Sequence, residues 1–235
     1  MTPIAPRTRT DPTAAAARRG AVWDLPTRLF HWLLVLLIAF SWWSAEEEHL
    51  DWHIWSGAAV LTLLLFRLMW GLVGSSTARF ANFVRGPKAI AAYLKDMKGW
   101  RPIGHSPLGA LSVLVLLGAV AVQVGLGLFA SDKDGLNQGP LAYLVSFDAA
   151  EEIADLHEDF FNILLVLIGL HLAALLFYRL VLGKKLVAPM ITGRAVLDPG
   201  TEPMRPGRWW LALLCLLLAV AITRWVLAGA PLPGG

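Results

Sequence analysis

The sequence predicts an all-α integral membrane protein in which five helices cross the bilayer. Hydrophobic residues make up 57% of the 235-residue chain and charged residues only 16%, against about 25% charged residues in a typical soluble domain. The apolar residues gather into separate runs, each long enough for a helix to cross about 30 Å of hydrocarbon at about 1.5 Å per residue. These two observations favour a membrane-embedded helical bundle over a soluble globular domain.

The chain divides into a tail, a bundle and a C-terminal extension. Residues 1–21 are rich in alanine, proline, threonine and arginine without a periodic apolar pattern, which predicts a disordered cytoplasmic tail. Residues 22–193 contain four apolar runs and are expected to form the main membrane domain, and residues 194–235 add a linker and a fifth run. The predicted spans are 26–44, 53–73, 107–130, 158–182 and 209–228.

The positive charges predict the orientation of these spans. Of the 20 lysines and arginines, all except Lys133 and Arg224 fall in the N-terminal tail, the second loop, the fourth loop or their borders. The positive-inside rule places that side in the cytoplasm. We therefore expect a protein of the bacterial inner membrane with a cytoplasmic N-terminus and a periplasmic C-terminus. The opposite loops are acidic, and the loop at 131–157 is long enough to contain a short surface helix.

Two histidines belong to the fourth span, His157 at its outer end and His171 further along it. Histidine is costly inside a bilayer and generally serves a function there. His157 and His171 are 14 residues apart, so a helix turns through about 1,400° between them, which leaves them about 40° apart on one face, and rises about 21 Å. One helix therefore presents two imidazoles on the same side, one near the outer surface and one in the inner half.

The first two spans supply a partner for each of these histidines. The first span runs outward, which puts His31 at the depth of His171, and the second runs inward, which puts His53 at the depth of His157. Two facing imidazoles are the ligand set of a six-coordinate haem iron. A single cysteine excludes the C-x-x-C-H attachment of c-type haem. The sequence thus predicts two haem b groups, one held by His31 and His171 and the other by His53 and His157.

Other interpretations of the histidines explain less. Interhelical hydrogen bonding accounts for a single intramembrane histidine, but not for four that form two depth-matched pairs. A tetrahedral zinc site needs about four ligands, and each layer offers two. Within the spans the carboxylates that cation transporters use are missing. A haem-free membrane anchor or a metal transporter stays as the alternative from another functional class.

Several motifs of the chain are those of a known family. The segments are "TRLFHW", "HIWSGAAVLTLLLFRLMWGLVGSSTARF", "GHSPLGALSVLVLL", "GLGLFASDKDG" and "LHEDFFNILLVLIGLHLAALLFYRLVLGKKLVAPMITG". Over about residues 22–193 they resemble the b-type cytochrome subunit of nickel–iron hydrogenases and, more broadly, the prokaryotic di-haem cytochrome b561 family. The resemblance implies a transmembrane four-helix bundle with two haem b groups and axial ligands at His31, His53, His157 and His171. The fifth span departs from the shortest members of the family.

The resemblance also implies a function. Family members pass electrons between a partner at the outer membrane face and the quinone pool. The expected partners are therefore quinone and a periplasmic electron-transfer protein, or a dehydrogenase or hydrogenase subunit. The fifth span favours an electron-transfer subunit of an oxidoreductase complex over a stand-alone enzyme. The alternative is a self-contained superoxide:quinone oxidoreductase, although the acidic outer loops would repel an anionic substrate.

Four further positions are candidate site residues. His105, before the third span, is either a quinone contact and proton relay, since histidine titrates near neutrality, or a helix-entry residue. Arg67 is either a donor to a haem propionate or an arginine that extends to the lipid headgroups. Gly57, one turn after His53, and Gly71 on the same face either make room for the flat macrocycles or serve helix contacts.

Overall fold

The computed structural model describes residues 18–100 and 103–231 of the chain. Most of the predicted tail, residues 1–17, lies outside these described residues, and so do Arg101 and Pro102. Of the predicted tail, the structure describes only the last four residues, 18–21.

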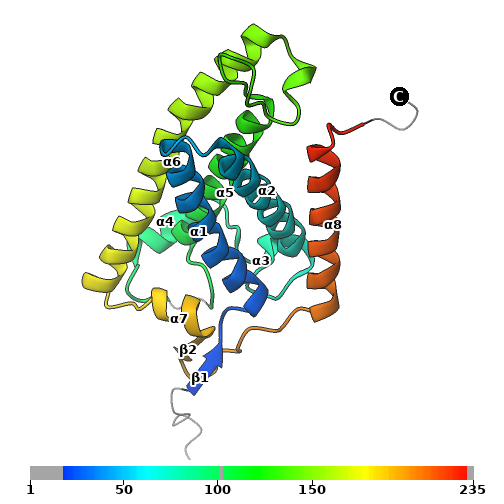
Figure 1. Ribbon diagram of the computed structural model, residues 1–235. Helices are drawn as coiled ribbons and strands as arrows, with labels where there is room; N and C mark the ends of the chain where they lie inside the picture. The colour runs from blue at the N-terminus through cyan, green and yellow to red at the C-terminus, as the bar shows by residue number, and fades with distance from the viewer. Residues whose placement is uncertain (1–17, 101–102, 232–235) are drawn as a thin grey trace, which may run out of the picture.

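Five helices of the described chain are long and apolar enough to cross a membrane, which confirms the predicted all-α membrane fold (Figure 1). Three of them begin at a side chain that caps the helix. Asp24 caps the first helix by accepting a hydrogen bond from the Thr27 amide, and Ser106 and Ser146 cap the third and fourth in the same way. The helices are α1 (Leu25–Glu46), α2 (Leu50–Val73), α5 (Pro107–Phe129), α6 (Phe147–Leu180) and α8 (Trp209–Leu227).

The four helices before α8 pack as two pairs. Helix α1 packs along α2 and α5 along α6, and the pairs meet mainly where α2 contacts α5. Helices α1 and α6, which carry His31 and His171, make little direct contact with each other. One apolar cluster at the α2–α5 contact is formed by Val60, Ala119, Val120 and Leu164. This arrangement leaves α6 joined to the bundle chiefly through α5.

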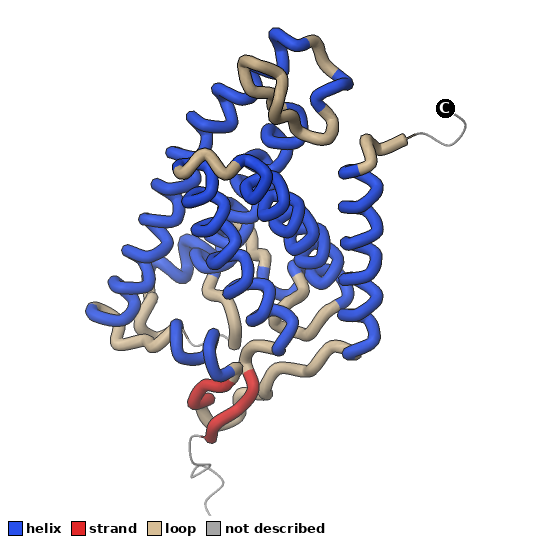
Figure 2. The backbone as a smooth tube through the Cα atoms, in the orientation of Figure 1, coloured by secondary structure: helices blue, strands red, loops and turns tan. Residues whose placement is uncertain are grey.

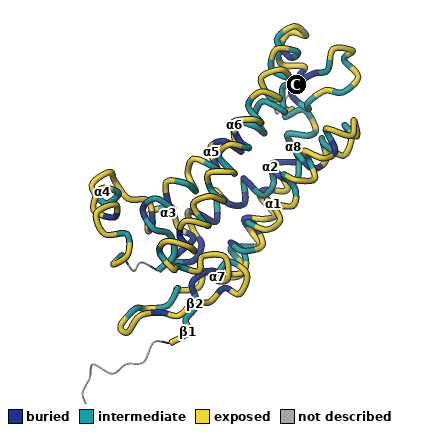
Figure 3. The backbone as a smooth tube through the Cα atoms, turned by 90° about the vertical axis from the view of Figure 1, so that its left-hand side faces the viewer, coloured by how far each residue is buried: buried dark blue, intermediate teal, exposed yellow. Residues whose placement is uncertain are grey.

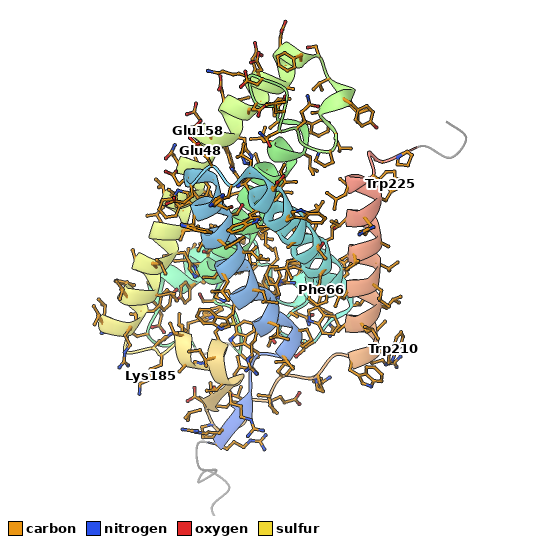
Figure 4. All side chains as sticks on the ribbon, viewed as in Figure 1. Glu48, Phe66, Glu158, Lys185, Trp210 and Trp225 are labelled. Carbon is orange, nitrogen blue, oxygen red and sulfur yellow. The ribbon has the colours of Figure 1, made fainter. Side chains whose placement is uncertain are left out.

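Helix α8 stands at the edge of the bundle against α2, with Trp210 and Trp225 near its two ends (Figure 4). The contact is apolar, with Cys215 and Ala219 buried in the cluster that contains Phe66. A single interhelical hydrogen bond crosses it, from the Thr62 hydroxyl to the Thr223 hydroxyl at 2.9 Å. The fifth span is therefore an addition to α2 and lies away from α1 and α6.

The short elements gather at the end of the bundle where α1 begins (Figure 2). We call this the inner end, following the orientation predicted from the charges, and the opposite one the outer end. The helices here are α3 (Phe80–Phe83), α4 (Pro87–Lys95) and α7 (Val187–Thr192), and the strands are β1 (Arg18–Ala21) and β2 (Arg194–Leu197).

The prediction of a disordered segment up to residue 21 is wrong for Arg18–Ala21. These residues pair antiparallel with β2, with Arg18 opposite Leu197 and Ala21 opposite Arg194. Leu197 is buried beside Val22 and Trp23 in a small apolar cluster. Local composition did not reveal the strand, because its hydrogen-bonding partner lies at the far end of the predicted membrane domain.

The fourth crossing helix is longer than its apolar run. Helix α6 begins at Phe147 rather than near residue 158, and it projects past the level of Glu48 and Glu158 at the outer end (Figure 4). The separate surface helix expected in the 131–157 loop is therefore replaced by this extension and by the short 3₁₀ turn η1 (Ala142–Leu144). The apolar run marks only the part of a helix that lies in hydrocarbon, so it did not mark the true start.

Much of α6 is exposed on the surface of the isolated chain (Figure 3). In the most apolar 18-residue stretch of α6 only 6% is buried, compared with 39% of the corresponding stretch of α2. Extended apolar surface of this kind marks contact with a membrane or a partner. Helix α2 is thus the central element of the protein, and α6 is a peripheral one.

Candidate functional site

The structure brings His53 of α2 and His157 of α6 together at the outer end. Their ring centroids are 5.8 Å apart and the two ring planes are perpendicular. Bonds between a metal and an imidazole nitrogen are about 2 Å long, so two imidazoles that share one ion have centroids about 6 Å apart. The separation in this outer pair therefore fits two ligands on opposite sides of one iron.

Both rings of the outer pair are anchored through Nδ1. The Nδ1 atom of His53 lies 2.9 Å from the Ser41 carbonyl oxygen, and that of His157 lies 2.9 Å from the Gln123 carbonyl oxygen. A ring nitrogen in contact with a carbonyl must carry the proton, which leaves Nε2 with its lone pair. This is the tautomer and the outer hydrogen bond found for histidines that bind metals.

The inner pair is held differently. His31 of α1 and His171 of α6 are both half-buried, and they are close enough for electrostatic interaction between their rings. The Nδ1 atom of His31 is buried and has no hydrogen-bond partner among the described residues. The ring of His31 instead contacts the edge of Trp32, with centroids 4.9 Å apart. The described protein thus leaves a polar atom unsatisfied at this layer.

A buried cation lies at the inner end of α2. Arg67 is only 2% exposed, and its guanidinium lies over the Phe80 ring, 4.7 Å from the centroid. The carboxylate of Asp24 supplies the nearby negative charge, while accepting hydrogen bonds from the Thr27 amide and the Trp70 indole. The Nη1 atom of Arg67 has no partner within the described segments. It is an unused buried donor, as an anionic group such as a haem propionate requires.

His105 lies near this cation, between two aromatic rings. Its centroid is 4.6 Å from that of Trp23 and 4.4 Å from that of Phe83. Burial, and secondarily the charge of Arg67, lower the pKa of His105 to about 3, so the ring is neutral at physiological pH. Its Nδ1 atom is buried without a hydrogen-bond partner in the described chain. His105 is therefore a desolvated imidazole with a free polar atom rather than a residue that caps the helix, which is the role of Ser106.

The two glycines of α2 prove to differ. An added Cβ at Gly57 would meet open space, which agrees with a neighbouring flat group. At Gly71 it would lie 2.0 Å from the Phe80 ring. The expectation that Gly71 makes room for a macrocycle is therefore wrong, because Phe80 already fills the space.

Taken with these features, the histidine layers fit the predicted haems. The outer pair has the required ring separation and tautomer, and the inner layer offers unpartnered donors at His31 and Arg67. The described residues contain no group of three or more histidine, cysteine, aspartate or glutamate side chains suited to holding a metal ion. Each layer therefore offers two histidine side chains and no third such residue within the described chain.

Comparison with known proteins gives a family match. The sequence matches the prokaryotic cytochrome b561 family over residues 22–193, which is most of the chain. The chain belongs to the prokaryotic cytochrome b561 family. Members of the cytochrome b561 family are di-haem membrane bundles of four helices, and they bind two b-type haems. No match was found among curated proteins or among solved structures.

Sequence reasoning missed two groups of residues that contact the cytochrome's candidate site. Gln123 of α5 contacts His157 both through its backbone and through its side chain. At the inner end, the hydroxyl groups of Tyr93 and Tyr178 are 2.6 Å apart, and Tyr178 lies 3.3 Å from the Ser106 hydroxyl. Gln123 had a visible signal, because it is the only amide in an otherwise apolar span and polar groups within a membrane are costly. The tyrosines are too far apart in the sequence for any local pattern to pair them.

Proposed function

We propose that this cytochrome carries electrons across the membrane between a periplasmic redox partner and the quinone pool. His53 and His157 would hold an outer haem b, and His31 and His171 would hold an inner one. Bis-imidazole haem iron supplies one-electron chemistry without an open coordination position. The observation that carries the proposal is the outer pair, whose rings face each other at 5.8 Å with both Nδ1 atoms bonded to backbone carbonyls.

The spacing along α6 supports transfer between two centres. His157 and His171 occupy one continuous helix, so about 21 Å of helix separates them. A flat macrocycle at each layer brings the two redox groups nearer to each other than their irons. The protein's part is to fix this spacing, and α6 does so as a single unbroken helix.

The inner end suits exchange with quinone. We assign Arg67 to a propionate of the inner haem, because its buried Nη1 donor is unpaired in the described chain and arginine binds carboxylates well. We assign His105 to the quinone headgroup, because its Nδ1 has no partner in the described chain and the Trp23 and Phe83 rings lie beside it. At the outer end, Gly57 leaves open space on α2 one turn after His53, where the outer haem would be held.

The outer end suits a partner protein with a basic surface. Glu48 and Glu158 are both exposed at the outer end (Figure 4), and further carboxylates lie on the α6 extension. Charge of one sign attracts a partner of the opposite sign over long range. The same charge repels superoxide, so it opposes the self-contained oxidoreductase.

The test is haem content of the purified protein and of single-histidine variants. We expect two haem b groups per chain in the wild type, from the reduced-minus-oxidised spectrum and extracted haem. His53→Ala and His157→Ala should each lose the same haem, and His31→Ala and His171→Ala the other. His49→Ala is the matched control, because His49 is an exposed outer histidine that contacts Trp52; it should retain both.

Two results would contradict the proposal. One is a wild-type protein with fewer than two haems. The other is a pairing of losses different from that above, for example His157→Ala and His31→Ala removing the same haem.

A further inference from the structure

Helix α5 carries no histidine between Pro107 and Phe129, yet it makes the closest contacts with one of the outer ligands. The Gln123 carbonyl accepts a hydrogen bond from Nδ1 of His157 at 2.9 Å. The Gln123 side-chain amide donates to the His157 carbonyl at 2.9 Å. One residue of α5 therefore engages both the imidazole and the backbone of His157.

The same amide also reaches the second ring nitrogen. Nε2 of Gln123 lies 3.3 Å from Nε2 of His157. The contact is consistent with the tautomer set by the backbone bond, since an Nε2 without a proton accepts from an amide N–H. The amide oxygen of Gln123 is buried without a partner in the described chain. The side chain is therefore oriented by the contacts of its amide nitrogen alone.

Gly127 lies one helical turn after Gln123 and forms the other part of the contact. A Cβ added at Gly127 would lie 2.9 Å from Cε1 of His157 and 3.3 Å from Nδ1. Such distances are too short for unstrained packing, so the imidazole occupies the room that the missing side chain leaves. Two residues earlier, a Cβ at Gly125 would meet open space.

We propose that Gln123 and Gly127 are the positioning residues of the outer haem ligand His157. Gln123 fixes the tautomer and holds the α6 backbone at His157, and Gly127 gives the ring its place against α5. The Nε2 lone pair of His157 would be the group that holds the haem, and the 3.3 Å contact places the Gln123 amide beside it. The inference rests on the proposed function, and it extends the site to a helix that contributes no ligand. His53 has no equivalent side-chain support from α5; it is anchored by Ser41 of α1.

Two variants and one matched control test the assignment on the purified full-length cytochrome. In Gly127→Ala the new methyl group displaces the His157 ring, so the low-spin EPR signal and the midpoint potential of the outer haem should shift. In Gln123→Leu the amide donor is lost, and the affinity for the outer haem should fall about 10-fold to 100-fold, as for other residues that orient metal ligands. Gly125→Ala should leave both haems as in the wild type.

The inner haem serves as an internal reference, and His157→Ala identifies which signal is the outer one. Equal shifts of both haems in Gly127→Ala would indicate a general packing defect and overturn the inference. Unchanged signals in both Gly127→Ala and Gln123→Leu would also overturn it, while the loss of one haem in His157→Ala would leave the proposed function standing. If His157→Ala keeps both haems, the proposed function itself fails.

Discussion

The outer and inner histidine pairs share α6 but differ in what holds their imidazoles. At the outer end, backbone carbonyls of Ser41 and Gln123 bind Nδ1 of both rings. At the inner end, Nδ1 of His31 is buried without a partner among the described residues. A buried polar atom without a hydrogen bond costs about 1–3 kcal/mol, so within the described chain the inner layer carries a cost that the outer layer avoids.

The charged groups around the two layers also differ, in sign and in exposure to solvent. The outer end carries exposed carboxylates such as Glu48 and Glu158. The inner end holds a buried guanidinium, Arg67, and a neutral buried imidazole, His105. The outer layer is thus preorganised by hydrogen bonds and surrounded by screened charge, and the inner layer contains desolvated groups that respond strongly to protonation and to neighbouring charge.

The largest expected effect is a loss of folding stability in acid, and it should arise at the inner end. Burial lowers the pKa of His105 to about 3, while the unfolded chain titrates near 6.5. A lowered pKa means that the unfolded state binds the proton first, so stability falls as pH drops below about 6.5. At pH 5 the loss is at most about 2 kcal/mol. Arg67 and Asp24 are the charged groups nearby.

Hydrogen exchange at pH 7 and pH 5 measures this difference between the ends. The segments around His105 should exchange faster at pH 5, and His105→Asn should abolish that change. The outer loop should stay protected, because hydrogen bonds from Asn137 and neighbouring amides lower the pKa of Asp132 below its usual 3.8; its contribution is lost only in more acidic solution. Equal loosening of both ends at pH 5 would contradict the comparison.

The second prediction concerns the potential of the inner haem. A buried cation favours the reduced form of a neighbouring redox group, so Arg67→Gln should lower the midpoint potential of the inner haem. A change of about 1.4 kcal/mol corresponds to about 59 mV for one electron. Redox titration followed by optical spectra measures it, with Arg67→Lys as the variant that keeps the charge. A shift confined to the outer haem would reverse the assignment of the two ends.

The sequence was sufficient for those parts of the fold that follow from hydrophobicity and helix geometry. The five spans were predicted because apolar runs report directly on hydrocarbon thickness, and the close approach of His53 and His157 followed from antiparallel topology alone. The strand at Arg18–Ala21 was missed, since its pairing depends on β2, which lies at the other end of the domain. The extension of α6 from Phe147 was missed because charged helical turns outside the bilayer lack the apolar signal.

Within the candidate site, the sequence did not predict which neighbours each side chain contacts. Helical periodicity places a residue on a face but does not say what stands opposite. Gly57 and Gly71 share a face of α2, yet one borders open space and the other touches Phe80. Gln123 and His157 lie on different helices, and only the packing of α5 on α6 brings them into contact.

The smallest expected effect is on the free energy of unfolding, from a substitution in α8. This helix carries neither histidine pair, so it serves as a reference for both ends. The bond between the Thr62 and Thr223 hydroxyls is the one interhelical hydrogen bond across the α2–α8 contact within the described chain. Interhelical hydrogen bonds in membrane proteins contribute about 0.6 kcal/mol on average. Thr223→Val keeps the shape and removes the donor and acceptor, so the free energy of unfolding in detergent should fall by about that amount.

Both haem spectra and both midpoint potentials should stay unchanged in Thr223→Val, because α8 carries none of the four histidines and packs mainly along α2. The measurement is denaturant unfolding followed by redox titration of the same sample. A shift of either potential would mean that movements of α2 reach a haem layer through Gly57 or His53. In that case the fifth helix would be coupled to electron transfer, and the outer layer would depend on more than its local hydrogen bonds.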